Sequence, residues 1–114
     1  MRPEEIHPLF VNAFNAGDVD AVVSLYEADA VFVSGAKGPM SGRAGIRAVF
    51  GALLAARPQM TLITREVTVA GDLTLLRGEW TLGGRRGLST EVVRRQPDGR
   101  WLYVIDAPGV GVTS

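Results

Sequence analysis

The sequence contains no cysteine, and it has a single histidine among its 114 residues. Without thiols the chain can form no disulfide framework, no thiolate metal site and no thiolate nucleophile. The one histidine, His7, lies close to the N-terminus with no neighbouring ligand residues, which argues against a bound metal ion and against a Ser-His-Asp set. We therefore expect no cofactor, and a fold stabilised by packing alone.

An excess of charge of either sign is also missing, because twelve Lys and Arg residues balance twelve Asp and Glu residues. Nucleic-acid-binding domains need an excess of basic residues, so this balance argues against a nucleic-acid partner. No stretch approaches the ~18 apolar residues of a membrane-spanning helix, and the N-terminus lacks the apolar run of a secretory signal. We expect no membrane partner and a cytoplasmic location, which the lack of cysteine fits.

The composition that remains is typical of one globular domain. Hydrophobic residues make up 46% of the sequence and charged residues 21%, which is ordinary for such a protein. No internal repeat, low-complexity linker or shift in composition divides the chain. Residues 1–114 are therefore expected to form a single domain.

The first half of the sequence has mainly helical periodicity. Apolar residues recur at helical spacing over residues 6–16, and Gly17 can end that helix in the left-handed conformation. Residues 18–26 predict a second, shorter helix that Tyr26 closes. A brief β-prone run follows at residues 30–33, and a third helix is expected from about residue 41 to the Arg-Pro pair at 57–58.

The second half changes to the character of β-strands. A stretch rich in Thr, Val and Ile at residues 60–70 is followed by three further stretches, and turn signals that contain Gly, Asp or Pro separate the four. Helices first and an antiparallel meander second predict an α+β fold, in which the sheet buries one face against the helices. The expected strands are residues 60–70, 73–82, 85–96 and 100–107.

The order of these elements and several short motifs resemble the nuclear transport factor 2-like superfamily. Residues 14–21 (FNAGDVDA) and 25–32 (LYEADAVF) resemble its opening, and residues 42–47 (GRAGIR) and 95–101 (RQPDGRW) look like its SnoaL-like and ketosteroid-isomerase-like branches. The resemblance implies a cone-shaped curved antiparallel sheet wrapped around N-terminal helices, a pocket at one end and commonly a homodimer. Members include isomerases, cyclases, dehydratases and binding proteins, so the motifs specify fold better than function.

The catalytic pattern that the resemblance implies for a ketosteroid isomerase is mostly absent. Its oxyanion-binding tyrosine falls on Phe10, which cannot donate a hydrogen bond. Its general base falls on Ser34, whose hydroxyl is too weakly basic to abstract a proton from carbon. Its second oxyanion donor, an aspartate on the third long strand, falls on Glu91, which keeps a carboxyl group. Steroid isomerisation by that mechanism is therefore not expected.

Glu91 and Asp106 are the candidate catalytic pair. They lie on the two strands that the turn at residues 97–99 joins, and two strand registers are open. If the turn pairs Gln96 with Trp101, Glu91 lies opposite Asp106 on one face of the sheet. If residues 97–99 alone form the loop, the two acids lie on opposite faces, and local turn chemistry slightly favours this shorter loop. We adopt the first register because the family resemblance favours it.

Two carboxyl groups inside an apolar cone would disfavour each other's ionisation. Desolvation and repulsion raise at least one of the two pKa values, which places a protonated donor next to an ionised acceptor. Such a pair suits isomerisation, cyclisation, dehydration or epoxide opening. The alternative is that both acids face water or form salt bridges with Arg43, Arg94 or Arg95.

Aromatic side chains supply further candidates for a ligand-binding cavity. Trp80 lies on the apolar face of its strand with Gly78, which would leave room there or curve the sheet. The resemblance places Tyr26 at the edge of the pocket. Simple core packing is the alternative for each of these residues. The candidate ligand-binding residues are Phe10, Phe14, Tyr26, Phe32, Ser34, Trp80 and Val104.

Trp101 and Tyr103 alternate along the last strand with Leu102 and Val104. In the adopted register the two aromatic residues lie on the outer face of the sheet, where large apolar patches mark interfaces. We therefore expect a homodimer through that face.

Three functions remain open at this stage. The first is a cofactor-free enzyme that acts on a small apolar oxygenated molecule through Glu91 and Asp106. The second is a non-catalytic binder of a similar ligand, which Phe10 and Ser34 support. The third is a dimeric interaction module. A cavity of about 300 Å³ or more with converging polar groups would favour the first two, and a filled cone would favour the third.

Overall fold

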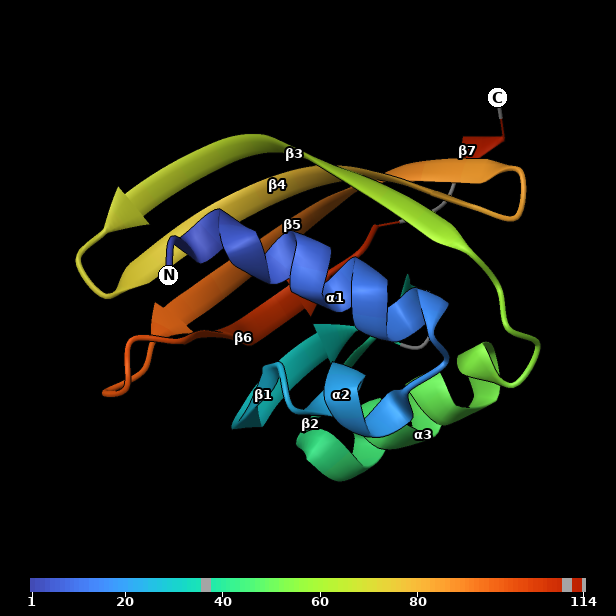
Figure 1. Cartoon of the computed structure of the whole chain (residues 1–114), viewed down its shortest axis with the longest axis horizontal. Coiled ribbons are helices and arrows are strands. Elements are labelled where there is room, and N and C mark those ends of the chain that lie inside the picture. Colours follow the sequence, from blue (N-terminus) through green and yellow to red (C-terminus); the bar gives the residue numbers. More distant parts are fainter. Residues whose placement is uncertain (36–37, 110–111, 114) are drawn as a thin grey trace.

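In the computed structural model, which describes residues 1–35, 38–109 and 112–113, helices pack against the inner face of a curved sheet (Figure 1). The helices are α1 (Ile6–Asn15), preceded by a 3-10 turn at Pro3–Glu5, then α2 (Val19–Val23) and α3 (Arg43–Leu54). No helix of the described residues is long and apolar enough to cross a bilayer. The α+β fold class that the sequence predicts is confirmed.

The helix ends follow local sequence signals. Gly17 adopts a φ of +69° just after α1, a conformation that glycine accepts without strain. The carboxylate of Asp18 accepts a hydrogen bond of 3.0 Å from the backbone N–H of Ala21 and so caps α2. The expected end of this helix at Tyr26 is wrong, because α2 ends at Val23 and Tyr26 begins a strand.

The sheet has the strand order β2-β1-β6-β5-β4-β3, and β7 pairs with β5. All described pairings are antiparallel except that of β1 with β6, which is parallel. The predicted bounds of the second and third helices and of the first strand need correction, whereas those of β3 and β4 are confirmed. The strands are β1 (Tyr26–Val33), β2 (Pro39–Ser41), β3 (Met60–Ala70), β4 (Leu73–Leu82), β5 (Arg85–Arg95), β6 (Trp101–Ala107) and β7 (Val112–Thr113).

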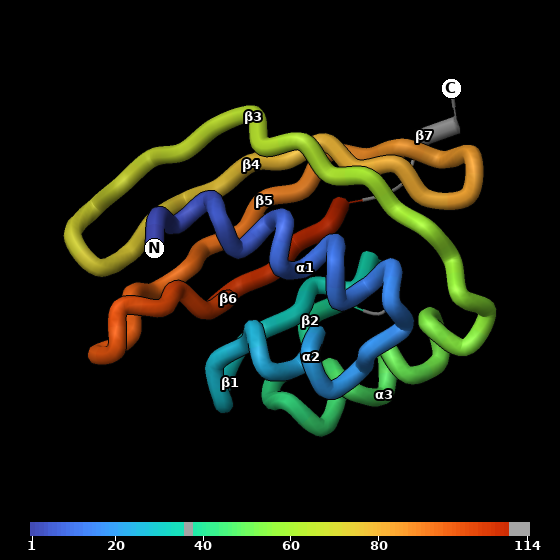
Figure 2. The backbone as a smooth tube through the Cα atoms, viewed as in Figure 1, coloured from blue at the N-terminus to red at the C-terminus, as the bar shows by residue number. Residues whose placement is uncertain are grey.

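The long strands bend together over the first helix. Figure 2 shows β3, β4 and β5 arching over α1, while α2 and α3 lie next to β1 and β2. This arrangement gives the sheet a concave face that the helices cover only in part. The cone-shaped architecture implied by the resemblance is therefore present.

Both registers considered for the β5–β6 hairpin occur in the structure, at different distances from the turn. Near the turn Val93 pairs with Tyr103, and the N–H of Gln96 donates to the Arg100 carbonyl at 2.7 Å, as the short loop requires. Further along, Glu91 pairs with Asp106. A β-bulge at Val104, the extra residue of β6, converts one register into the other.

Because of this bulge, the aromatic pair on β6 does not lie on the face that the sequence predicts. Trp101 and Tyr103 are 6% and 2% exposed and belong to the core, not to the outer face of the sheet. The prediction was wrong because it assumed strict alternation along β6, whereas the extra residue reverses the facing of everything before it. The indole N–H of Trp101 donates to the Met1 carbonyl at 3.1 Å, beneath the N-terminus.

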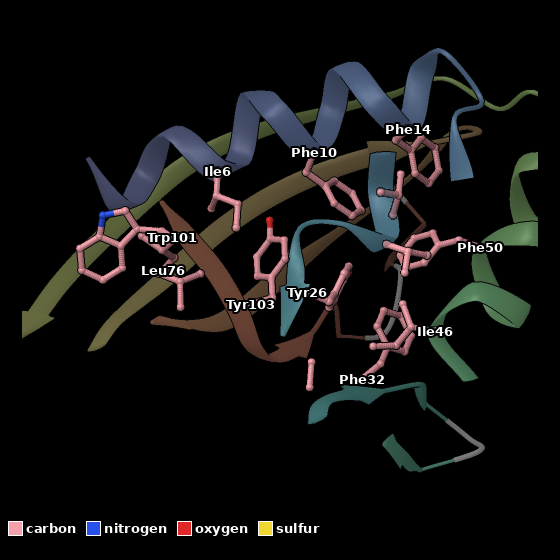
Figure 3. Packing of buried hydrophobic residues seen from close by; sticks show 14 of the residues in the cluster. Ile6, Phe10, Phe14, Tyr26, Phe32, Ile46, Phe50, Leu76, Trp101 and Tyr103 are labelled. Carbon is pink, nitrogen blue, oxygen red and sulfur yellow. The ribbon is translucent and has the colours of Figure 1, made fainter. Parts of the chain in front are cut away.

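The core is a cluster of aromatic rings between α1, α3 and the strands β1 and β6 (Figure 3). The Phe10 ring contacts the Phe50 ring at 5.7 Å and the Tyr103 ring at 6.0 Å between centroids, both edge to face. The rings of Tyr26 and Tyr103 lie 4.9 Å apart. Such pairs add to the free energy of burial, and together they fix the positions of both tyrosines.

Candidate active site

A cavity of about 230 Å³ lies between the helices and the concave face of the sheet. Its wall is mostly aromatic and aliphatic, and its carboxyl groups come from β5 and β6. The volume is below the range of about 300–1,000 Å³ typical of drug-sized ligands, so an occupant would be small. The lining residues are Phe10, Phe14, Phe32, Phe50, Leu53, Met60, Leu62, Trp80, Leu82, Ser89, Glu91, Tyr103, Asp106, Pro108 and Gly109.

Glu91 and Asp106 meet in this cavity. They are direct cross-strand partners on β5 and β6, and the two residues are 3% and 7% exposed. Cβ atoms of such partners lie about 4.5–5.5 Å apart. The two acids therefore lie next to each other on the inner face of the sheet, as the adopted register predicts.

The arginines that offered an alternative explanation are occupied elsewhere. Arg94 pairs with Glu27 at 3.0 Å and Arg95 with Asp72 at 2.7 Å, both at the surface. Arg43 donates to the backbone carbonyl of Tyr26 at 2.6 and 2.9 Å. None of these three arginines forms a salt bridge with the buried acids.

Asp106 receives a hydrogen bond from Tyr26. The phenol donates to Oδ2 of Asp106 at 2.5 Å, and both groups are buried. Burial raises the pKa of Asp106 to about 7, with a further rise from the charge of Glu91, while the hydrogen bond from Tyr26 opposes the change. Near neutral pH this carboxyl group is therefore present in both protonation states.

Glu91 has a different partner, the only histidine of the chain. Nε2 of His7 lies 2.5 Å from Oε1 of Glu91, and Nδ1 lies 2.7 Å from the Thr64 hydroxyl. The neutral ring can donate to Glu91 and accept from Thr64, and the protonated ring donates to both. Either way, the two acids of the pair have different chemical surroundings.

His7 is thus a site residue that the sequence pattern did not predict. It is 1% exposed and lies within α1. A signal was present, because His7, Phe10 and Phe14 share the spacing i, i+3, i+7 of one helix face. A histidine on the buried face of a helix needs polar partners, and β3 and β5 supply them.

The remaining predicted site residues divide into two groups. Phe10, Phe14, Phe32 and Trp80 line the cavity, and the Trp80 indole donates to the Pro108 carbonyl at 2.7 Å. The other candidates do not line it. Tyr26 lies behind Asp106, Ser34 follows the end of β1, where its N–H donates to the Gly38 carbonyl, and Val104 is the half-buried bulge residue.

Two hydroxyl-bearing residues on the cavity wall were not predicted to lie there, and one of them, Tyr103, was expected on the outer face of the sheet. Ser89 lies on β5, and its Oγ is buried without a hydrogen-bond partner. Tyr103 lies on β6, and its hydroxyl makes no hydrogen bond to any described residue. Ser89 shares the inner face with Glu91 at a spacing of two, and that spacing is the signal that could have identified it.

Gly78 allows two side chains of the site to pack closely against β4. A Cβ atom at this position would lie 2.7 Å from Cδ1 of Leu62 and 2.9 Å from Oγ of Ser89. Only glycine allows both side chains to approach the strand this closely. The space that Gly78 was expected to leave on the inner face is thus filled by Leu62 and Ser89. Within the described ranges, no group of three or more acidic or histidine side chains is placed to hold a metal ion.

Comparison with known proteins gives the family. The profile of the SnoaL-like domain matches residues 9–105, whereas a search of curated proteins gives no match. Among solved structures, a ketosteroid isomerase-like protein from Erwinia carotovora is 17% identical, with a TM-score of 0.78 over 92% of this chain and 90% of that one. A candidate dehydratase of the NTF2-like family from Streptomyces avermitilis is 21% identical, with a TM-score of 0.76 over 95% and 94%.

A third structure supports the same assignment. An NTF2-like protein with a cystatin-like fold from Novosphingobium aromaticivorans is 27% identical, with a TM-score of 0.75 over 91% of this chain and 78% of that one. The family profile covers most of the chain, and the fold agrees with it. The chain therefore belongs to the SnoaL-like family within the nuclear transport factor 2-like superfamily.

Proposed function

We propose that this protein is a cofactor-independent enzyme that moves a proton on a small, apolar, oxygenated molecule, as an isomerase, cyclase or dehydratase does. The observation that carries the proposal is the Glu91–Asp106 pair on the wall of an apolar cavity. A solvated acid would be ionised and a weak base, whereas Asp106 has a pKa of about 7. A group with such a pKa can both accept and return a proton at neutral pH.

The partners of the two acids support separate roles for them. Glu91 contacts His7, which can compensate its negative charge, and Asp106 is oriented by Tyr26. Asp106 is the proton-transfer group in this proposal because its ionised and neutral forms are close in free energy. The aromatic wall excludes water and holds the apolar part of the substrate.

The test is proton exchange on a simple ketone. 2-Tetralone, a bicyclic ketone with acidic α-protons, is incubated with the protein in D₂O at neutral pH, and loss of the α-proton signals is followed by NMR. We expect exchange above the protein-free rate, and a loss of about a hundredfold or more in Asp106→Asn, as is typical when a general base is removed.

The matched control is Asp29→Asn, the same substitution at an exposed position of β1, which should exchange at the wild-type rate. An exchange rate that is unchanged in Asp106→Asn would contradict the proposal. Non-catalytic ligand binding is the second candidate function, and it is favoured by the presence of Phe10 and Ser34 where the resemblance implies a donor and a base. Saturable binding of 2-tetralone without any exchange would support this second function.

A further inference from the structure

Two side chains on the cavity wall have hydrogen-bonding groups that nothing in the described chain satisfies. Oγ of Ser89 is buried and unpartnered. Tyr103 is 2% exposed, and its hydroxyl has no partner among the described residues. Buried polar groups in native proteins are nearly always paired, so each exception requires an explanation. Ser89 and Tyr103 both lie on the wall of the same cavity, whereas Thr74, whose Oγ1 is also buried and unpartnered, does not line it.

The strand register places these two residues on opposite sides of the carboxyl pair. Ser89 precedes Glu91 by two residues on the inner face of β5, a step of about 7 Å. Tyr103 pairs with Val93, which follows Glu91 by two residues on the same face. Along the sheet the order is therefore Ser89, then the carboxyl pair, then Tyr103.

The two tyrosines of the site differ in what their hydroxyl groups do. Tyr26 donates to Asp106, whereas the neighbouring Tyr103 donates to no described residue. In Figure 3 the Tyr103 ring projects from β6 toward α1, and its hydroxyl lies between Ile6 and Phe10. Burial raises the pKa of Tyr103, and the charges of Asp106 and Glu91 raise it further. The hydroxyl therefore keeps its proton at neutral pH and remains a donor.

On the other side of the carboxyl pair, the Ser89 hydroxyl is also available to a ligand. Its strand neighbour is Gly78, and the missing side chain there leaves the space that Oγ of Ser89 occupies. The serine χ1 angle has three staggered positions, so the hydroxyl can turn to a ligand without movement of the backbone. The hydroxyl can both donate and accept a hydrogen bond.

We propose that Ser89 and Tyr103 bind two separate oxygen atoms of one ligand, on either side of the Glu91–Asp106 pair. The substrate class is then a compact apolar ring compound with two oxygen functions, such as a hydroxyketone or a diketone, whose reacting carbon lies between them. The inference rests on the proposed function for the reaction itself, and it adds that the substrate has two oxygen functions. A ligand with one oxygen atom would leave one of the two hydroxyl groups unpaired.

The experiment compares three probes of the same bicyclic shape by isothermal titration calorimetry. Tetralin carries no oxygen, 2-tetralone carries one, and 6-hydroxy-2-tetralone carries two at opposite ends. The variants are Ser89→Ala, Tyr103→Phe and the double variant, each of which removes only hydroxyl oxygens. A hydrogen bond in such a series contributes about two- to tenfold in affinity.

We expect each single variant to bind 6-hydroxy-2-tetralone about two- to tenfold more weakly than the wild type, and the double variant to lose the product of the two factors. 2-Tetralone should be weakened by only one of the two single variants, and tetralin by neither. Thr74→Val is the matched control, because Thr74 also has a buried, unpartnered hydroxyl but does not line the cavity. It should leave all three affinities unchanged.

The inference would be overturned by an affinity for 6-hydroxy-2-tetralone that neither variant changes, or by an equal loss of affinity for tetralin, which would indicate a purely structural effect. Failure of 6-hydroxy-2-tetralone to bind would also overturn it. These affinities do not depend on turnover. If the expected binding pattern is found without α-proton exchange, the proposed enzymatic function is refuted and the proposed ligand class stands. If α-protons exchange but the variants leave the affinities unchanged, the ligand class is refuted and the enzymatic function stands.

Discussion

Tyr103 and Asp106 face the same cavity although they are three positions apart on one strand. In a regular strand, residues at an odd spacing point to opposite faces. The extra residue Val104 breaks the alternation, because the strand pairs in one register before it and in another after it. The bulge therefore places a phenol and a carboxyl group on the same wall.

The free energy of unfolding should fall as the pH rises from about 4 to about 7. The pKa of Asp106 is raised from 3.8 to about 7 in the folded state, so in this window the folded protein binds more protons than the unfolded chain. The groups that surround this carboxyl are Glu91 with its partner His7, and the two tyrosines, Tyr26 and Tyr103. The loss should be on the order of 2–4 kcal/mol.

Denaturant unfolding at pH 5 and pH 8 measures this effect. Asp106→Asn cannot ionise, so it should lack the loss and be more stable relative to the wild type at pH 8 than at pH 5. Asp29→Asn should follow the wild type at both values. Parallel pH profiles for the wild type and Asp106→Asn would show that Asp106 titrates normally.

Tyr26→Phe should raise the pKa of Asp106 further. The Tyr26 hydroxyl donates to Oδ2 of Asp106 and thereby favours the ionised form. Titration of the Asp106 carboxyl carbon by NMR gives the value directly in the wild type and in the variant. Tyr103→Phe is the comparison, because it removes a neighbouring hydroxyl that does not bond to Asp106, and it should change the pKa less. A pKa that is unchanged or lowered in Tyr26→Phe would contradict the assignment.

His7→Ala should destabilise the fold by about 3–5 kcal/mol, because it leaves the Glu91 carboxylate buried without its partner. Replacement of both members by apolar residues is far less costly than the loss of one. The double variant His7→Ala/Glu91→Leu should therefore be more stable than His7→Ala alone, as measured by thermal unfolding. Arg47→Ala, which breaks an exposed ion pair with Asp20, should cost at most about 1 kcal/mol. A double variant that is less stable than His7→Ala would refute the buried pair.

We expect the protein to form a homodimer through the outer face of the sheet. Ile63, Leu88 and Ile105 are 52%, 71% and 40% exposed, and the pairings of Ile63 and of Leu88 with Glu79 place them on the same face. Leu88→Glu would put a charge in that interface and should yield a monomer in sedimentation at micromolar concentration. Leu9→Glu, at an exposed apolar position on α1, should leave the dimer intact. A monomeric wild type would contradict the expectation.

Local patterns in the sequence were sufficient for most of the fold. The strands at residues 60–70 and 73–82 follow from the Pro58 break before the first and the turns at Gly71-Asp72 and Gly83-Gly84 after each, and the structure has the same bounds. Tyr26 was misplaced because its neighbours have helical spacing. What decides its conformation is the parallel pairing with Tyr103, a contact that is distant in sequence and invisible in a local window.

The site was predictable only where two strands meet across one turn. Glu91 and Asp106 could be paired because a short hairpin fixes register, and the family resemblance indicated which register to adopt. His7 and Tyr103 could not be placed in this way. His7 contacts Glu91 from a helix near the other end of the chain. Tyr103 points into the cavity because of a bulge, and no single residue type predicts a bulge.

The His7–Glu91 contact joins the first helix to the fifth strand, and it spans 84 positions of sequence. A partly folded chain that has formed its hairpins but not docked α1 would hold this acid without a compensating group and with one side of the chamber open. The complete acid–base site therefore exists only when α1 is docked on the sheet, and any activity of the site also reports that α1 is docked.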